Sequence, residues 1–339
     1  MSTSIRNISV AIDGTKSSGF CIELDGTRWR LDNFMLSQSL LSPNTLSFSL
    51  HKEPDERINE VSFNVCGAII GKEVLVSLET ESIEKESLKA DTDSVADIEF
   101  AGVITGASGS RNRSEFTVNV EACSWDALLN DNPTCKSFEN QTLNDIVNDV
   151  VDDYSEHLKT DVDARFTDTI PYSVQYNESN YQFLQRLARR YGEWLYNDGL
   201  KMVFGNLPKG ESVRLAYPSQ DVPSYNVDLK MRHIAFNHVA SSYNSYDANE
   251  KEGIEEMQRE YNTLSEQVFL ASQSCFVKPT LQNLHSGGFA DTDGRETVLN
   301  VSTKTQARGE KASMLTYSGT TYCSKLKIGS KLVIVDNYM

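Results

Sequence analysis

The chain has 339 residues, a mass of 37.9 kDa and a formal net charge of −16. Its length predicts two or three domains, and its 39% hydrophobic content is enough to form folded cores. An acidic balance of this size repels phosphate, which argues against a general nucleic-acid binder and against an anionic membrane surface. The excess acid either keeps the chain soluble or meets a basic partner, and the sequence leaves both interpretations open.

Neither disulfide frameworks nor membrane segments are predicted. The six cysteines are scattered without a CxxC pair, so we expect them to be reduced and to bind no metal. The N-terminus has no apolar signal core, and no apolar run approaches the roughly 18 residues of a membrane span. We therefore expect a chain that folds in the cytoplasm, inserts in no membrane and uses another route if it leaves the cell.

Residues 1–130 have the pattern of short strands. Ile8, Val10 and Ile12 recur with a period of two, and the same alternation returns at 46–50, 74–78 and 116–120. Turn-forming residues separate these segments, as is typical of an antiparallel barrel or sandwich. We predict a first β-barrel-like domain over 1–135.

Two amphipathic helices follow. The segment Thr142–Leu158 has apolar residues at steps of three and four, and Thr142 can cap its first turn. In Ser179–Tyr191, Ser179 and Gln182 fit a capping box, and Gly192 can take the left-handed conformation that ends the helix.

A hairpin turn comes next, at Asn197-Asp198-Gly199. Together with the two helices it predicts a mixed adaptor over 136–205. The strand pattern then returns and predicts a second β-barrel-like domain over 206–339.

A polar segment near 250–268 interrupts the second strand-rich region. Its apolar residues Ile254, Met257, Tyr261 and Leu264 step by three and four, which predicts a helix with a narrow apolar stripe. This helix either packs on its own domain or contacts a neighbouring subunit, and both interpretations stay open.

Motifs for chemistry are weak throughout. Gly205–Ser212 has glycine spacing like that of a phosphate-binding loop, but Glu211 stands where the lysine is needed. His233 and His238 lie five residues apart in a strand-like segment, so they point to opposite faces and do not chelate. We predict no catalytic residue, no cofactor and no metal site, and hence no enzyme.

The segment from Ile170 to Gly192, followed by Trp194–Gly199, resembles the signature of the valine-glycine repeat protein G (VgrG) family of type VI secretion spikes. In this sequence the matching residues are Gln175, Tyr176, Glu178, Ser179, Phe183, Leu184, Leu187 and Gly192. Weaker likenesses occur at Phe100–Thr105, Ser137–Leu143 and Gly319–Cys323. The residues of the signature cap or pack a helix, so the motif marks a fold and not an active site.

The resemblance implies the N-terminal hub of a contractile injection machine, similar to contractile phage baseplate hubs. Its fold is a β-rich α+β class, with two antiparallel β-barrel-like domains separated by the helical adaptor. Such a hub is a homotrimeric ring that joins a hexameric tube protein to a trimeric spike, with baseplate components and effectors as further partners. It assembles in the cytoplasm and is then secreted or delivered into target cells.

Two other classes of function are considered as alternatives. A tail-associated peptidoglycan hydrolase needs two carboxylates facing each other across a cleft, and nothing singles out such a pair among the 48 acidic residues. A carbohydrate-binding module needs exposed aromatic side chains. Tyr172, Tyr176 and Tyr181 are candidates, but we expect them to lie inside the packing motif.

Overall fold

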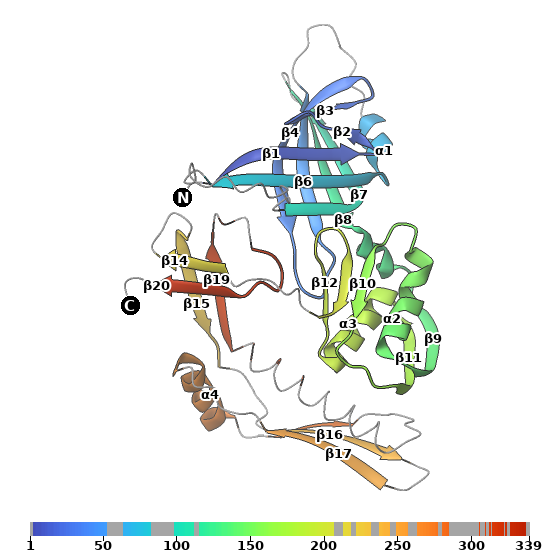
Figure 1. Cartoon of the computed structure of the whole chain (residues 1–339), viewed down its shortest axis with the longest axis vertical. Helices are drawn as coiled ribbons and strands as arrows, with labels where there is room; N and C mark the ends of the chain where they lie inside the picture. Colours follow the sequence, from blue (N-terminus) through green and yellow to red (C-terminus); the bar gives the residue numbers. More distant parts are fainter. Residues whose placement is uncertain are drawn as a thin grey trace, which may run out of the picture.

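In the computed structural model, part of the chain is described. The described residues are 3–52, 64–82, 98–111, 115–206, 213–217, 222–231, 237–244, 249–256, 263–276, 280–284, 305, 309, 312, 314–321, 323 and 326–336. Figure 1 shows an N-terminal barrel, a mixed subdomain below it, and C-terminal strands beside both.

The N-terminal part is one nearly closed antiparallel sheet in the order β2-β1-β6-β7-β8-β5-β4-β3. Its two edge strands are consecutive in the chain, and the short segment that joins them contains an isolated bridge between Ser18 and Cys21. The strands are β1 (Thr3–Ile12), β2 (Thr15–Lys16), β3 (Cys21–Leu24), β4 (Thr27–Ser37), β5 (Thr45–Lys52), β6 (Glu73–Ser82), β7 (Ile98–Arg111) and β8 (Phe116–Ser124).

The period-two pattern explains the barrel core. Val10, Leu50, Val74 and Val118 are fully buried, each on the inward side of its strand. The short helix α1 (Asn64–Ile69), which the sequence pattern did not predict, adds buried side chains to the same core. The predicted barrel-like, strand-rich architecture is therefore confirmed for this part of the chain.

The mixed subdomain places two helices against short strands around a second core. Phe183, Leu184 and Ile146 are fully buried in it, and the rings of Phe138 and Phe183 stack with centroids 5.4 Å apart. Its elements are a 3₁₀ helix (Trp125–Asn130), β9 (Thr134–Gln141), α2 (Leu143–Val151), a 3₁₀ turn (Asp152–Tyr154), β10 (Thr160–Asp163), β11 (Ile170–Glu178), α3 (Asn180–Tyr191), β12 (Trp194–Asn197) and β13 (Met202–Gly205).

Beyond residue 206 the described strands form three small sheets, ordered β14-β20, β15-β19 and β17-β16-β18. The pairs β14–β20 and β16–β18 are parallel, and the other pairs are antiparallel. A second barrel and the domain boundaries at 135 and 205 stay predictions. The elements are β14 (Val213–Tyr217), β15 (Ser224–Leu229), β16 (Asn237–Asn244), β17 (Asn249–Glu256), α4 (Thr263–Cys275), β18 (Thr280–Leu284), β19 (Leu315–Thr320) and β20 (Leu332–Asp336).

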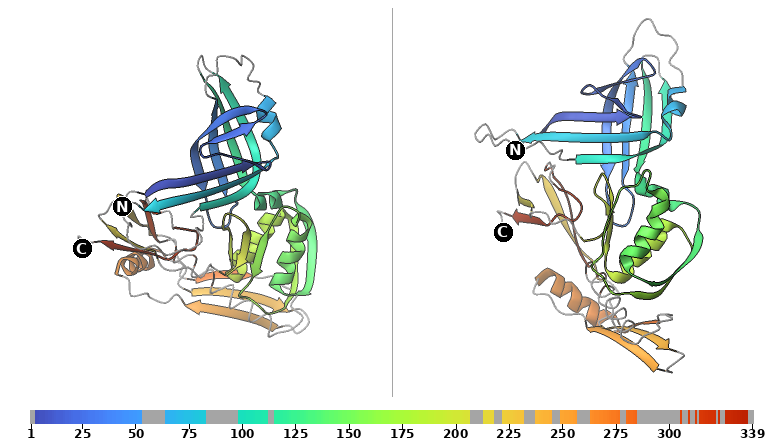
Figure 2. Two further views of the ribbon diagram at one scale, coloured as in Figure 1. Left: turned by 45° about the horizontal axis from the view of Figure 1, so that its top comes forward. Right: turned by 45° about the vertical axis from the view of Figure 1, so that its right-hand side comes forward.

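The predicted helix near 250–268 is wrong in its first half. Residues 249–256 form β17, which pairs with β16 in an antiparallel ladder, and Ile254 lies opposite Val239. Both views of Figure 2 show β16 and β17 at the end of the molecule opposite the barrel. A spacing of three and four cannot reveal a distant strand partner, and Gly253 weakens a helix at this point.

The helix of this region begins later, at Thr263, as α4. Leu264 lies in its first turn with 39% of its surface exposed, whereas Met257 and Tyr261 lie outside the described residues. The structure thus does not bring the four predicted contact residues together on one helix. Their role as a subunit contact remains a prediction.

Candidate functional site

The family-motif residues lie on β11, on α3 and at the two caps of α3, and several of them fix how the helix starts. The Ser179 hydroxyl accepts a hydrogen bond from the Gln182 main-chain N–H at 3.2 Å, and Gln182 Oε1 accepts one from Ser179 N–H at 3.0 Å. This reciprocal pair is the predicted capping box. Gln175 is buried and donates from Nε2 to the Glu178 carbonyl and to Asn180 Oδ1. These two hydrogen bonds fix the position of β11 relative to the first turn of α3.

Glu178 and Arg186 form an ion pair that connects the end of β11 to the side of α3. Arg186 Nη2 lies 2.5 Å from Glu178 Oε1, and Nε lies 3.2 Å from both carboxylate oxygens. The same guanidinium donates to the Val174 carbonyl at 2.6 Å. The sequence analysis did not predict this pairing. A spacing of eight residues across a strand-to-helix turn gave no signal for it.

The remaining motif residues bury the helix and end it. Phe183, Leu184 and Leu187 are at most 1% exposed. Gly192 has φ of 73°, which is the left-handed conformation predicted for it. A side chain at this position would also collide with Thr305, because an added Cβ would lie 2.7 Å from the Thr305 hydroxyl.

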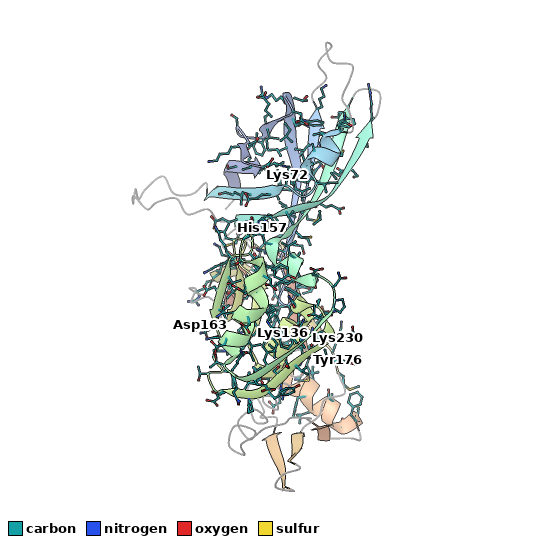
Figure 3. The ribbon with its side chains drawn as sticks, turned by 90° about the vertical axis from the view of Figure 1, so that its right-hand side faces the viewer. Lys72, Lys136, His157, Asp163, Tyr176 and Lys230 are labelled. Atoms are coloured by element: carbon teal, nitrogen blue, oxygen red, sulfur yellow. The ribbon has the colours of Figure 1, made fainter. Side chains whose placement is uncertain are left out.

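Tyr176 differs from the rest of the motif, since 77% of its surface is exposed. Tyr172 and Val174 alternate with it on the outer face of β11 and are also exposed. Figure 3 looks onto this side of the molecule and labels Tyr176 and Lys136 of the paired strand β9. Of the three candidate tyrosines, only Tyr181 lies inside the packing motif as predicted.

A second feature, which the sequence did not reveal, is the joint between the barrel and the mixed subdomain. The loop between β4 and β5 carries Leu41, a non-glycine residue with φ of 59°. Its N–H donates to the Leu195 carbonyl at 2.8 Å, and its carbonyl accepts from Gln185 Nε2 at 2.5 Å. Both main-chain groups of Leu41 are therefore bonded across the joint, and this holds the residue in a conformation that is unfavourable for leucine.

Two buried side-chain amides form further hydrogen bonds across the joint. Asn44 is fully buried, and its Nδ2 donates to the Asn197 carbonyl at 3.1 Å. Asn197 in turn donates from Nδ2 to Asp126 Oδ1 at 2.9 Å. The predicted turn at 197–199 therefore also contacts the barrel. Gly199 approaches the barrel so closely that an added Cβ would lie 2.2 Å from the Glu99 carbonyl oxygen.

Asp126 is the charged member of this joint and is fully buried. Burial raises the pKa of its carboxyl, while hydrogen bonds from Ser124 and Asn197 partly oppose that shift. Its Oδ2 and the nearby hydroxyl of Tyr181 have no hydrogen-bond partner among the described residues. Burial, and the carboxylate of Asp126, also raise the pKa of Tyr181. The joint is therefore polar although it is fully buried.

The described residues show no arrangement suited to metal binding. Among them, no group of three or more His, Cys, Asp or Glu side chains is placed to hold an ion. All six cysteines are free, and Cys135 and Cys275 are exposed. No described helix is long and apolar enough to cross a membrane.

Comparison with protein families gives one match over most of the chain. The family described as phage tail baseplate hub (GPD) matches residues 59–337. The chain belongs to this family. Its members are structural proteins of the baseplate hub, which agrees with the resemblance carried by the motif on β11 and α3. None of the curated proteins compared with the chain matches it.

Solved structures support the same fold. A tail protein from Neisseria meningitidis MC58 is similar with a TM-score of 0.62 at 10% identity, over 100% of this chain and 88% of that chain. The 43 kDa tail protein of prophage MuSo2 from Shewanella oneidensis has a TM-score of 0.59 at 13% identity, over 98% and 90%.

A type VI secretion protein is also among the structural neighbours. The E. coli c3393 protein, a component of that system with similarity to T4 tail proteins gp27 and gp5, has a TM-score of 0.41 at 18% identity. The match covers 68% of this chain and 56% of that chain.

Proposed function

We propose that this chain is the hub subunit of a contractile injection machine. Three copies form a ring that joins a hexameric tube to a trimeric spike, and the ring transmits axial force without catalysing a reaction. Baseplate components, the spike and its effectors are further partners, and the assembled machine delivers the hub out of the cytoplasm. Membership of the baseplate hub family supports this role.

The observation that best supports a ring of several copies is the exposed apolar surface of the C-terminal strands. Two-stranded sheets are marginal in water unless another surface covers them. Yet the strands β15, β19 and β20 and the residues next to them expose large apolar side chains to between 37% and 55% of their surface. They are Val227, Leu229, Met231, Tyr317, Leu332 and Val335.

These strands also have little core of their own. The buried hydrophobic residues described beyond residue 206 are only Leu215, Val222, Phe269 and Met314, whereas each of the first two subdomains has a large core. A second copy supplies the missing cover. A contact of this kind is obligate and apolar, and a head-to-tail arrangement of it closes a ring.

The distribution of charged residues also supports a second copy of the chain as the partner. The described parts of β14, β15, β20 and their flanks carry more basic than acidic residues, although the whole chain has a net charge of −16. The mixed subdomain is rich in acid, so opposite charges would meet across a head-to-tail contact. The charged residues of the strands and flanks are Arg214, Lys230, Lys327 and Lys331, with Asp228 and Asp336.

The test is the solution mass of the chain by light scattering over a range of concentrations. A ring predicts a stable species of about 114 kDa, three times the 37.9 kDa chain. Two exposed valines on strands form a matched pair, Val227 at 37% and Val174 at 38%. Val227→Asp should give monomers, whereas Val174→Asp should leave the trimer intact. A wild-type chain that stays monomeric throughout would overturn trimerisation by these residues.

A carbohydrate-binding role has one observation in its favour. Tyr172 and Tyr176 lie on the same exposed face of β11, about 13 Å apart along the strand. Exposed aromatic rings at such a spacing can stack on sugar rings. Titration with peptidoglycan fragments tests the role. Binding that is lost in Tyr176→Ser would favour it, and no binding by the wild-type chain would remove it.

A further inference from the structure

A cavity of about 630 Å³ lies beside the joint, where three parts of the chain meet. The β4–β5 loop contributes Leu40 and Leu41, and the end of α3 with the start of β12 contributes most of one wall. The third side is made by helical residues spaced by four and three, Thr305, Gly309 and Ala312. The volume is in the range of small-molecule sites and is several times the roughly 150 Å³ that accommodates benzene.

The walls are mainly apolar and aromatic. The rings of Phe166 and Tyr191 pack with centroids 4.6 Å apart, and Trp194 and Leu195 continue the same surface. On the opposite side, small residues leave the space open. A Cβ added at Gly309 would meet no atom within 4 Å. An apolar body of one or two rings, or an acyl chain, therefore has matching surfaces on both sides.

The described lining of the cavity contains three charged side chains, and two of them form an ion pair. Glu193 has a fully buried side chain, and its Oε1 accepts a hydrogen bond from the Phe166 N–H at 2.9 Å. Its Oε2 accepts one from Arg165 Nε at 3.3 Å, and Arg165 also donates to the Gly192 carbonyl. Glu193 and Arg165 thus neutralise each other.

Among the described residues of the lining, Arg189 is the remaining charged side chain. It is exposed, and no described residue forms an ion pair or hydrogen bond with it. The described part of the lining therefore carries an uncompensated positive charge, on a chain whose net charge is −16. A guanidinium beside an apolar surface favours a ligand that presents a carboxylate, sulfonate or phosphate next to an apolar group.

We propose that this cavity is a binding site for an amphipathic anion, with its apolar body between the aromatic wall and Gly309 and its anionic group at Arg189. A free carboxylic acid and an aromatic side chain beside an acidic residue of a partner protein share this chemistry. The site is independent of ring formation, since none of the exposed C-terminal strand residues lines it.

The probes are two dyes of similar shape. 8-Anilinonaphthalene-1-sulfonate carries an anion, and N-phenyl-1-naphthylamine is neutral. Fluorescence titration of the full chain should find one site for each. Arg189→Gln should weaken the sulfonate dye about tenfold and change the neutral dye less than about twofold. Equal weakening of both dyes, or of neither, would overturn the placement of the anion at Arg189.

A cavity-filling variant shows where the dyes bind. Gly309→Phe should weaken both by at least about tenfold, whereas Gly309→Ala adds one methyl group and should bind both like the wild type. Circular dichroism and a solution mass equal to that of the wild type confirm that each variant is folded. Unchanged binding to Gly309→Phe would place the dyes on another apolar surface and overturn the proposal.

Displacement then separates the two sources of ligand. Loss of dye fluorescence on adding decanoate supports a free amphipathic acid. Loss on adding a short acidic peptide with one phenylalanine supports a segment of a partner protein. If neither displaces the sulfonate dye, the site accepts the dye alone and the proposal fails.

Discussion

Asn44 of the barrel donates its buried side-chain amide to the main-chain carbonyl of Asn197 in the mixed subdomain. The two residues are 153 positions apart in the sequence, and both are at most 2% exposed. Because the bond joins the two large cores, the barrel and the mixed subdomain are expected to unfold as one unit.

Replacing Asn44 with Ala tests this coupling. The change removes the amide and leaves the Asn197 carbonyl without that donor, which should lower the free energy of unfolding by about 1–3 kcal/mol. Chemical denaturation followed by two probes, one in each subdomain, should show transitions that no longer coincide. Asn148→Ala, at an exposed position of α2, is the control and should change stability by less than about 0.5 kcal/mol.

Replacing Leu184 or Leu187 with Asp should unfold the mixed subdomain. Both side chains are at most 1% exposed, and a buried unpaired carboxylate costs several kcal/mol. Circular dichroism and the soluble yield measure the effect. Arg189→Asp, on the exposed face of the same helix, should remain folded. A soluble, cooperatively folded Leu184→Asp chain would contradict the packing of α3.

The Glu178–Arg186 pair should contribute only modestly to stability. The Arg186 side chain is 42% exposed, so water screens the attraction, and a coupling free energy of up to about 1 kcal/mol is expected. A double-mutant cycle with Glu178→Gln and Arg186→Met measures it, and the coupling should fall in 1 M salt. A coupling well above this range would mean that the bond to the Val174 carbonyl depends on Glu178.

Stability should depend on pH through Asp126. Its pKa is raised in the folded state, so the folded chain binds more protons than the unfolded chain. The contribution is present in full below the unfolded pKa of about 3.9 and is lost as pH rises through the raised folded value.

Denaturation at a series of pH values checks that sign. Asp126→Asn should flatten the curve, so that the variant gains stability relative to the wild type as pH rises above about 4. Asp153→Asn, at an exposed position, should follow the wild-type curve. A wild-type advantage that grows with pH would show that Asp126 is stabilised in its charged form.

The parts of the fold that could be predicted are those that depend on residues close together in the sequence. Ser179, Gln182 and Gly192 start and end α3 as their positions indicated, because capping depends on residues three or four apart. The alternation around Val10 and Leu50 likewise predicted inward-facing side chains of a barrel. Family membership, too, followed from ordered local motifs between 170 and 205.

Long-range pairing could not be predicted in the same way. Ile254 was assigned to a helix, but it lies in a strand whose partner begins at Asn237. The joint was missed because Asn44 and Leu41 have no periodic neighbours, and their hydrogen-bond partners lie far away in sequence. The exposure of Tyr176 was missed for a related reason, since a motif shows which residues recur together but not which side faces solvent.

The left-handed Leu41 has a practical consequence for dissecting this protein. Because its N–H and carbonyl are both bonded to the mixed subdomain, a fragment that ends at residue 124 would lose both bonds and expose the buried Asn44. A fragment of residues 1–206 keeps both cores and every bond of the joint. We therefore expect this fragment to fold when it is expressed by itself, whereas the strands beyond residue 206 have too little core to do so.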